Sequence, residues 1–164
     1  MIYSKLIKLI EDNADELTER MYKDLTSREE TKSYAKMNKD IVCERIYEVY
    51  SRLDTWLSKD KHKSGEIERL YTEVGRRRFR EGVPLHEVVM AFMLKKRHIW
   101  LYVLEKHFID SSYELYQALE MNNKVVLFFD RVIFFVTKGY EDELRKVADS
   151  KDKGVLSKLL KKKD

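Results

Sequence analysis

The chain contains one proline, Pro84, and it follows Gly82 and Val83 between two runs of helix-forming residues. Gly82 can adopt the left-handed conformation that ends a helix, and Pro84 suits the first position of the next helix, where its missing N–H costs nothing. Val83 is held out of the helical region by the proline that follows it. The segment predicts a very short corner between two helices. Because the 164 residues include only five glycines, such breaks are rare and long helices are expected.

Apolar residues at helical spacing on both sides of the corner predict an all-α fold. We expect a single domain, residues 1–150, built as a bundle of about five helices with a long last helix. The polar link SREETKS after the first helix can hold a short helix of its own. A globin-like arrangement without haem is the alternative architecture. The expected helices cover about residues 4–27, 38–56, 66–81, 84–108 and 112–148.

The last predicted helix is unusual in length and composition. At ~1.5 Å per residue it would be on the order of 55 Å long. Between Val125 and Val136 it is apolar nearly all round, so it lies at the centre of the fold or is shared with a second chain. We therefore expect a homodimer. The apolar run has twelve residues, includes Asp130 and Arg131, and is too short to span a membrane.

The net charge of +4 comes from the C-terminal segment, because residues 151–164 hold six lysines and two aspartates. The preceding 150 residues balance at zero, which argues against the broad basic field that phosphate binding requires. We expect residues 151–164 to form a basic, flexible tail. The single cysteine, Cys43, and an N-terminus without a secretory signal favour a cytoplasmic protein.

Two polar residues fall on predicted apolar stripes, where a polar side chain costs free energy unless it is paired. Lys96 lies between Phe92 and Ile99 on the fourth helix, and Asp130 borders the inward face of the fifth. We expect a basic residue of the fourth helix and Asp130 to meet inside the bundle. The alternative is that Lys96 extends its ammonium to the surface.

Motifs that carry catalysis or cofactors are not found in the sequence. No GxGxxG, GxxxxGK[ST] or GxSxG occurs, and the four histidines form neither an i, i+4 pair nor a Glu-x-x-His pair. We therefore expect no enzyme activity and no cofactor. His98 and His107 lie on a helix rich in apolar residues and are the candidate haem ligands if the core serves as a sensor for haem or a small apolar ligand.

Four arginines precede the corner within five residues, at positions 76, 77, 78 and 80. On the helical wheel Arg76 and Arg80 point away from the apolar stripe, Arg77 flanks it and Arg78 lies on it. They form no continuous basic face. They lie in the last turns of the predicted helix, where positive charge interacts favourably with the negative end of the helix dipole and the free carbonyl groups. Nucleic-acid binding through Arg76, Arg77, Arg80 and the lysine tail is the less favoured interpretation.

The corner and its flanks carry a recognisable pattern. A tyrosine and a Gly-Arg precede a Gly-Val-Pro-Leu corner, which a small-aromatic pair and a tryptophan follow. The run from Tyr71 to Trp100 resembles the signature of the RsbRD-type N-terminal domain, a helical module of stressosome-like and related transcription regulators. Phe92 and Met93 depart from the expected tyrosine and arginine. The residues that carry the resemblance are Tyr71, Gly75, Arg76, Gly82, Val83, Pro84, Leu85, Ala91, Phe92 and Trp100.

The resemblance implies a regulatory or sensory domain that acts by contact with a regulatory protein partner, which the sequence does not name. We expect no STAS or DNA-binding segment to follow, because the chain ends where one would begin. A weaker likeness to globin-coupled sensors implies a version without haem, since the segment RRRFRE contains no histidine.

Overall fold

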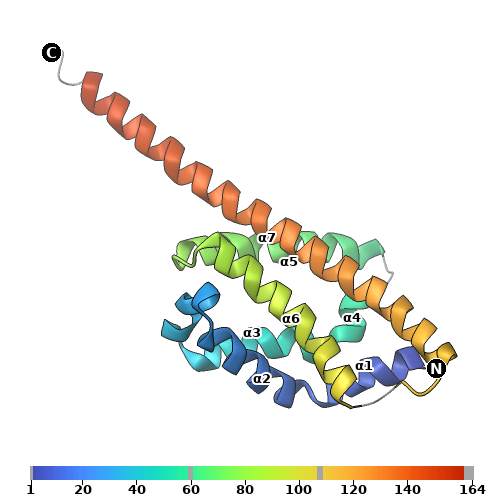
Figure 1. The fold of residues 1–164 in the computed structure, drawn as a ribbon. Helices are drawn as coiled ribbons and strands as arrows, with labels where there is room; N and C mark the ends of the chain where they lie inside the picture. The colour runs from blue at the N-terminus through green and yellow to red at the C-terminus, as the bar shows by residue number, and fades with distance from the viewer. Residues whose placement is uncertain (1, 59–60, 107–108, 161–164) are drawn as a thin grey trace.

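The computed structural model describes residues 2–58, 61–106 and 109–160, and side chains within 3–58, 64–106 and 109–154. All regular structure in these ranges is helical, which confirms the predicted all-α class. The described residues fold into seven α-helices and one 3-10 helix, more than the five predicted. Figure 1 shows how they are arranged. They are α1 (Ile2–Asp12), α2 (Ala14–Ser27), η1 (Glu29–Lys36), α3 (Lys39–Ser51), α4 (Leu53–Leu57), α5 (Lys61–Arg80), α6 (Leu85–Glu105) and α7 (Ser112–Leu160).

The predicted number of five is wrong because two of the expected helices are each divided in two. Asn13 separates α1 from α2 with φ −115° and ψ 23°, and its side-chain amide donates to the Leu9 carbonyl at 2.8 Å. Such local hydrogen bonds compete with the helical pattern of the backbone. Arg52 separates α3 from α4 with φ −127° and ψ 29°. Buried residues continue on both sides of each break, so the periodicity identified the inward face but not the change of direction.

The polar link after α2 forms η1, the short helix that the sequence allowed. A carboxylate on α6 holds it: Glu87 is buried and accepts from the Ser33 backbone N–H at 2.8 Å and from the Ser33 hydroxyl at 2.9 Å. Asn38 then caps α3 as predicted, because its side-chain oxygen accepts from the backbone N–H groups of Asp40 and Ile41. These bonds fix the first third of the chain against α6.

Helices α5 and α7 form the most extensive contact of the fold, and two glycines allow their backbones to touch. A Cβ atom on Gly75 would lie 2.0 Å from the Val136 carbonyl oxygen, and one on Gly139 would lie 1.9 Å from that of Thr72. Only glycine permits such an approach. Helix α7 runs through Gly139 as one continuous helix. This position serves close packing between helices.

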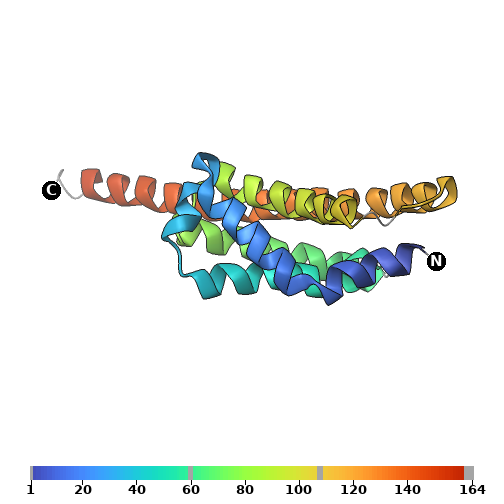
Figure 2. The same cartoon turned by 60° about the horizontal axis from the view of Figure 1, so that its bottom comes forward.

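Helix α7 crosses the whole body and then projects beyond it (Figure 1), and the rotated view shows the same projection (Figure 2). Its 49 residues extend over roughly 70 Å at ~1.5 Å per residue. It continues to Leu160, past the predicted domain boundary at residue 150. All side chains from Leu144 to Gly154 are exposed, so this part makes no core contact.

Candidate functional site

The corner between α5 and α6 has the predicted glycine geometry. Gly82 has φ 74°, in the left-handed region. The Val83 N–H bonds the Arg78 carbonyl at 3.1 Å and the Gly82 N–H bonds the Phe79 carbonyl at 3.0 Å, which together make a Schellman motif. Pro84 was predicted as the first helical residue of α6, but it is the N-cap, one position before the helix. Its carbonyl accepts hydrogen bonds from the backbone N–H groups of Glu87 and Val88. Backbone hydrogen bonds therefore close α5 and open α6 at this corner.

The corner is also fastened to α7. The Tyr140 hydroxyl donates to the Val83 carbonyl at 2.8 Å. The rings of Tyr140 and Phe79 meet edge to face, with centroids 5.3 Å apart. Tyr140 lies shortly before the part of α7 that leaves the body, so the joint and the projecting helix share a contact.

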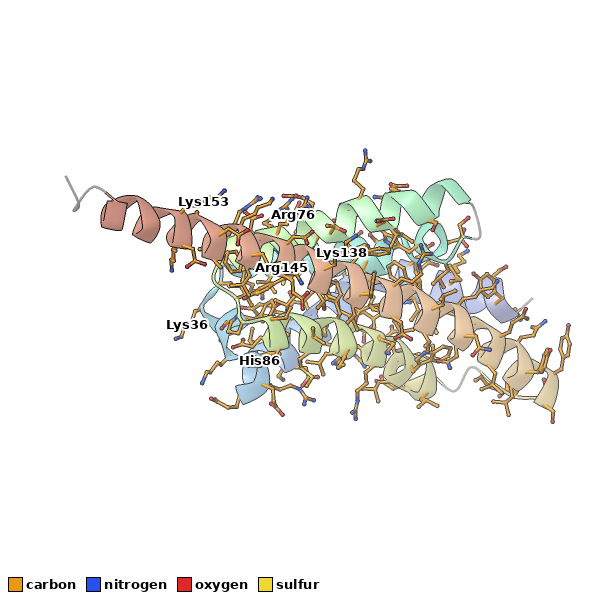
Figure 3. The ribbon with its side chains drawn as sticks, turned by 90° about the horizontal axis from the view of Figure 1, so that it is seen from above. Lys36, Arg76, His86, Lys138, Arg145 and Lys153 are labelled. Carbon is orange, nitrogen blue, oxygen red and sulfur yellow. The ribbon has the colours of Figure 1, made fainter. Side chains whose placement is uncertain are left out.

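The arginines before the corner bind protein carboxylates. Arg76 lies 3.6 Å from Asp142 and Arg80 lies 3.1 Å from Glu143, both on α7. Glu73 contacts both arginines from within α5, at 3.5 and 3.3 Å. Figure 3 shows Arg76 beside α7, close to where that helix leaves the body. These ion pairs support a role in joining α5 to α7.

The remaining residues of the family pattern divide between core and surface. Tyr71 is buried, with ring centroids 5.8 Å from Trp56 and 6.1 Å from Phe92. Ala91 is buried beside them, and Leu85 is half-buried at the start of α6. Trp100 is half-buried, and its indole N–H is buried without a hydrogen-bond partner among the described residues. The residues of the pattern that these contacts describe therefore serve packing between the helices.

Lys96 and Asp130 do meet, but the expectation that they meet inside the bundle is wrong. Their charged atoms lie 3.5 Å apart, and the side chains are 28% and 59% exposed. Because an exposed ion pair is screened by water, it contributes at most about 1 kcal/mol. The lysine that the bundle buries is the neighbouring Lys95.

The two candidate haem ligands differ in what the structure shows of them. His98 lies between α6 and α2, where its Nε2 is 2.8 Å from an Asp24 carboxylate oxygen. That nitrogen is therefore engaged at a helix interface. His107 lies outside the described residues.

Buried Lys95 and Arg78 form a cationic cluster with half-buried Arg45. Glu81 bridges the two arginines: its carboxylate lies 2.7 Å from Arg45 and 3.2 Å from Arg78. Desolvation lowers the pKa of Arg78, and the arginine contacts hold the pKa of Glu81 below its usual value despite its partial burial. Lys95 itself has no ion-pair or hydrogen-bond partner for its ammonium within the described part of the chain. Burial, followed by repulsion from Arg78 and Arg45, lowers its pKa to about 7.

An apolar groove lies on the other side of α6, between α6 and α7. It encloses about 280 Å³ and is lined mainly by Met93, Trp100, Leu101, Leu104 and Val126. Leu104 at its edge is 65% exposed, and the outward face of α7 adds Leu127 and Phe134, which are 60% and 63% exposed. We call the groove together with Leu127 and Phe134 the α6–α7 surface.

Lys95 is a buried residue that the apolar stripe predicted for α6 did not include. On a helical wheel Lys95 and Lys96 flank Phe92 and Ile99 on opposite sides, each about 40° from the nearer of the two. The predicted stripe included Val89 and Trp100, which are only half-buried, and this moved its centre toward Lys96. Ala91 and Tyr102, which are buried, place the centre at Lys95. The signal was present in the spacing, but the outer members of the stripe misplaced it.

Fold and geometry together define an all-helical domain with a hydrogen-bonded corner, an exposed apolar surface and a projecting C-terminal helix. Residues 14–153 match the family described as the RsbT co-antagonist protein rsbRD N-terminal domain. The chain belongs to this family, which confirms the predicted resemblance. The family is one of regulatory and signalling helical domains.

No curated protein matches the chain, and no solved structure matches it. The globin-like alternative therefore stays a prediction. Among the described residues, no helix is both long enough and apolar enough to cross a membrane.

Proposed function

We propose that this chain is a non-catalytic regulatory module that acts by protein–protein contact, and that the α6–α7 surface joins two copies into a homodimer. Membership of a family of regulatory domains supports the first part. The exposed apolar side chains of the α6–α7 surface are the observation that carries the second.

Helix α7 is apolar on two faces. This favours packing of the α6–α7 surface against helices of another chain. One face packs Val125, Phe129 and Val136 into the core, where all three are fully buried. The other presents Leu127 and Phe134 to solvent. A helix that is apolar on both faces normally contacts neighbours on both, and a large exposed apolar patch marks an interaction site.

A second copy fits this surface because a two-fold dimer needs only one self-complementary patch. Pairing α6 and α7 with the same helices of another copy would produce a four-helix interface. Cations and carboxylates are also available at its edge, where Lys96 and Asp130 already pair within the chain. The projecting part of α7, with its exposed side chains, is where we place contact with a regulatory partner.

The oligomeric state tests the dimer directly. We expect multi-angle light scattering to give a dimer for the wild type and a monomer for the double variant Leu127→Glu, Phe134→Glu, because carboxylates at the interface centre would be buried without partners. Ile41→Glu, an equally drastic change of an exposed residue on α3, is the matched control and should remain dimeric. Circular dichroism should show that all three proteins keep their helical content. A monomeric wild type at micromolar concentration, or a double variant that stays dimeric, would refute the proposal.

A further inference from the structure

A polar cavity lies between α3, α5 and α6, on the side of α6 away from the α6–α7 surface. Its volume is about 100 Å³. At ~30 Å³ for each water molecule, it has room for roughly three water-sized groups. Exposed Glu48 and Arg77 lie at its rim, whereas Arg78 and Lys95 lie at its buried end. The cavity therefore admits a small ligand from solvent to buried cations.

Lys95 is the residue at the buried end of the cavity whose charge no described residue pairs. It is 7% exposed, and its ammonium lies 4.5 Å from the centroid of the Phe92 ring. No hydrogen bond or ion pair joins that ammonium to any other residue in the described ranges. An ammonium carries three hydrogen-bond donors, and because Lys95 lines the cavity, a ligand there could accept from them.

Positive charge is also in excess around the cavity. Arg45, Arg77, Arg78 and Lys95 face it, against Glu48 and the nearby Glu81. Glu81 is already engaged by Arg45 and Arg78, and Glu48 lies 3.8 Å from Arg52. Neither carboxylate reaches Lys95, so a negative charge is missing at the buried end.

The rest of the wall is apolar. Val49, Leu70 and Val74 line the cavity together with the rings of Tyr71 and Phe92. Such a wall favours the hydrocarbon part of a ligand. Burying a doubly charged phosphate against it would cost much desolvation free energy. The ligand that matches both parts has one negative charge and a short hydrocarbon portion.

We propose that this cavity binds a small monocarboxylate, with the carboxylate paired to the Lys95 ammonium beside Arg78 and the carbon chain against Val49, Leu70 and Val74. Guanidinium groups are well suited to carboxylate recognition because their donors form a planar fork. The site and its ligand class are separate from the dimer surface.

Binding should depend on pH through Lys95. The other charged or titratable groups around it are Arg45, Arg77, Arg78, Glu48, Glu81, Tyr34 and Tyr71. Burial raises the pKa of Tyr71, so this phenol stays neutral. The pKa of Tyr34 is raised to about 12 by burial, so its phenol stays neutral, and the arginines stay charged. Because the pKa of Lys95 is about 7 in the empty site, the ammonium is present below that pH and becomes scarce above it. Carboxylate affinity is expected to fall as the pH rises from about 6 to about 9.

Isothermal titration calorimetry with sodium propionate and sodium butyrate tests the site in the full chain, with sodium chloride used to hold ionic strength constant. We expect one saturable site per chain at about pH 6. The Lys95→Met variant should bind about ten- to a hundredfold more weakly, because it loses hydrogen bonds to a charged group. Lys96→Met removes the neighbouring exposed ammonium and should bind as the wild type does. Glu48→Gln should bind more tightly, since it removes a negative charge from the rim.

Three results would overturn the proposal. The first is no saturable binding of either carboxylate by the wild type. The second is equal binding by the Lys95→Met variant, shown by circular dichroism to be folded. The third is sodium phosphate binding in place of the carboxylates. None of these readouts depends on the oligomeric state, so failure of this proposal is distinct from failure of the proposed dimer.

Discussion

Replacing Lys95 by methionine should stabilise the protein. The Lys95 side chain is enclosed by α3, α5 and α6, and its ammonium has no counter-ion among the described residues. Methionine keeps a flexible chain of similar length in the same space and removes the charge. Because a buried ion often costs more than its contacts return, the apolar variant is expected to unfold less readily.

The size of the effect follows from the pKa of Lys95. Its fall from the ordinary 10.5 to about 7 corresponds to roughly 4 to 5 kcal/mol near neutral pH, at ~1.36 kcal/mol per pH unit. This is an upper bound, because the variant also loses the contact between the ammonium and the Phe92 ring. Measured replacements of buried ions by apolar residues gain about 1 to 4 kcal/mol, and we expect the same range here.

The stability difference between the variant and the wild type should depend on pH, and the direction follows from the pKa of Lys95 in the folded and unfolded chain. In the unfolded chain Lys95 holds its proton up to about pH 10.5, whereas in the folded chain it loses the proton above about pH 7. The unfolded state therefore binds more protons between these values, and the lysine makes wild-type stability rise with pH in that window. The variant lacks this contribution. Its advantage over the wild type should be greatest at or below about pH 7 and should shrink as the pH approaches 10.

Urea unfolding at about pH 7 and about pH 9.5 measures both effects, at one protein concentration and in buffers free of carboxylates. A carboxylate that binds the cavity would stabilise the wild type and mask the difference. Lys96→Met is the control, because loss of the Lys96–Asp130 pair should lower stability by no more than about 1 kcal/mol. A Lys95→Met protein that is less stable than the wild type at both pH values, or whose gain is equal at both, would refute the reasoning.

Three further changes probe the joint between α5, α6 and α7, each followed by the free energy of unfolding from chemical denaturation. Gly139→Ala should destabilise by about 1 to 3 kcal/mol or more, because its Cβ would overlap the Thr72 carbonyl, whereas Gly154→Ala meets nothing within 4 Å and should be neutral or slightly stabilising. Gly82→Ala should cost about 1 to 2 kcal/mol because its φ of 74° disfavours a side chain. Tyr140→Phe should cost about 1 kcal/mol through loss of the bond to the Val83 carbonyl. An unchanged free energy of unfolding would contradict the close packing at Gly139, the left-handed backbone at Gly82 or the hydrogen bond of Tyr140, according to the variant that shows it.

The sequence predicts the buried faces of this fold well because burial follows the helical repeat, which is a local property. Leu6, Ile10, Leu17 and Met21 were placed on one face and are all fully buried, although Asn13 divides their helix. A break that keeps the apolar face inward leaves the spacing almost unchanged. The number of helices therefore could not be read from periodicity alone.

The polar features were harder to predict because they depend on which elements surround a helix. Helix α6 is covered by α2, η1, α5 and α7, so its buried face is wider than the stripe of large apolar residues and includes Ala91. Lys95 and Lys96 are 100° apart on the helix, and only this wider environment decides between them. Likewise, Gly75 belongs to the family pattern, but the need for a glycine there becomes clear only in the structure, where the backbone of α7 crosses α5 at this residue.

The two surfaces that we connect with function lie on one element, α6. Lys95 faces the cavity, while the next residue, Lys96, reaches Asp130 on α7 at 3.5 Å. The same helix begins at the corner, which Tyr140 joins to α7 just before that helix leaves the body. A shift of α6 against α5 would therefore act on α7 at two points at once. A ligand can favour such a shift only if it binds one position of α6 more tightly than the other, and only by that difference in affinity. Lys95 has no counter-ion in the described chain. A carboxylate bound to Lys95 would therefore be the source of that difference.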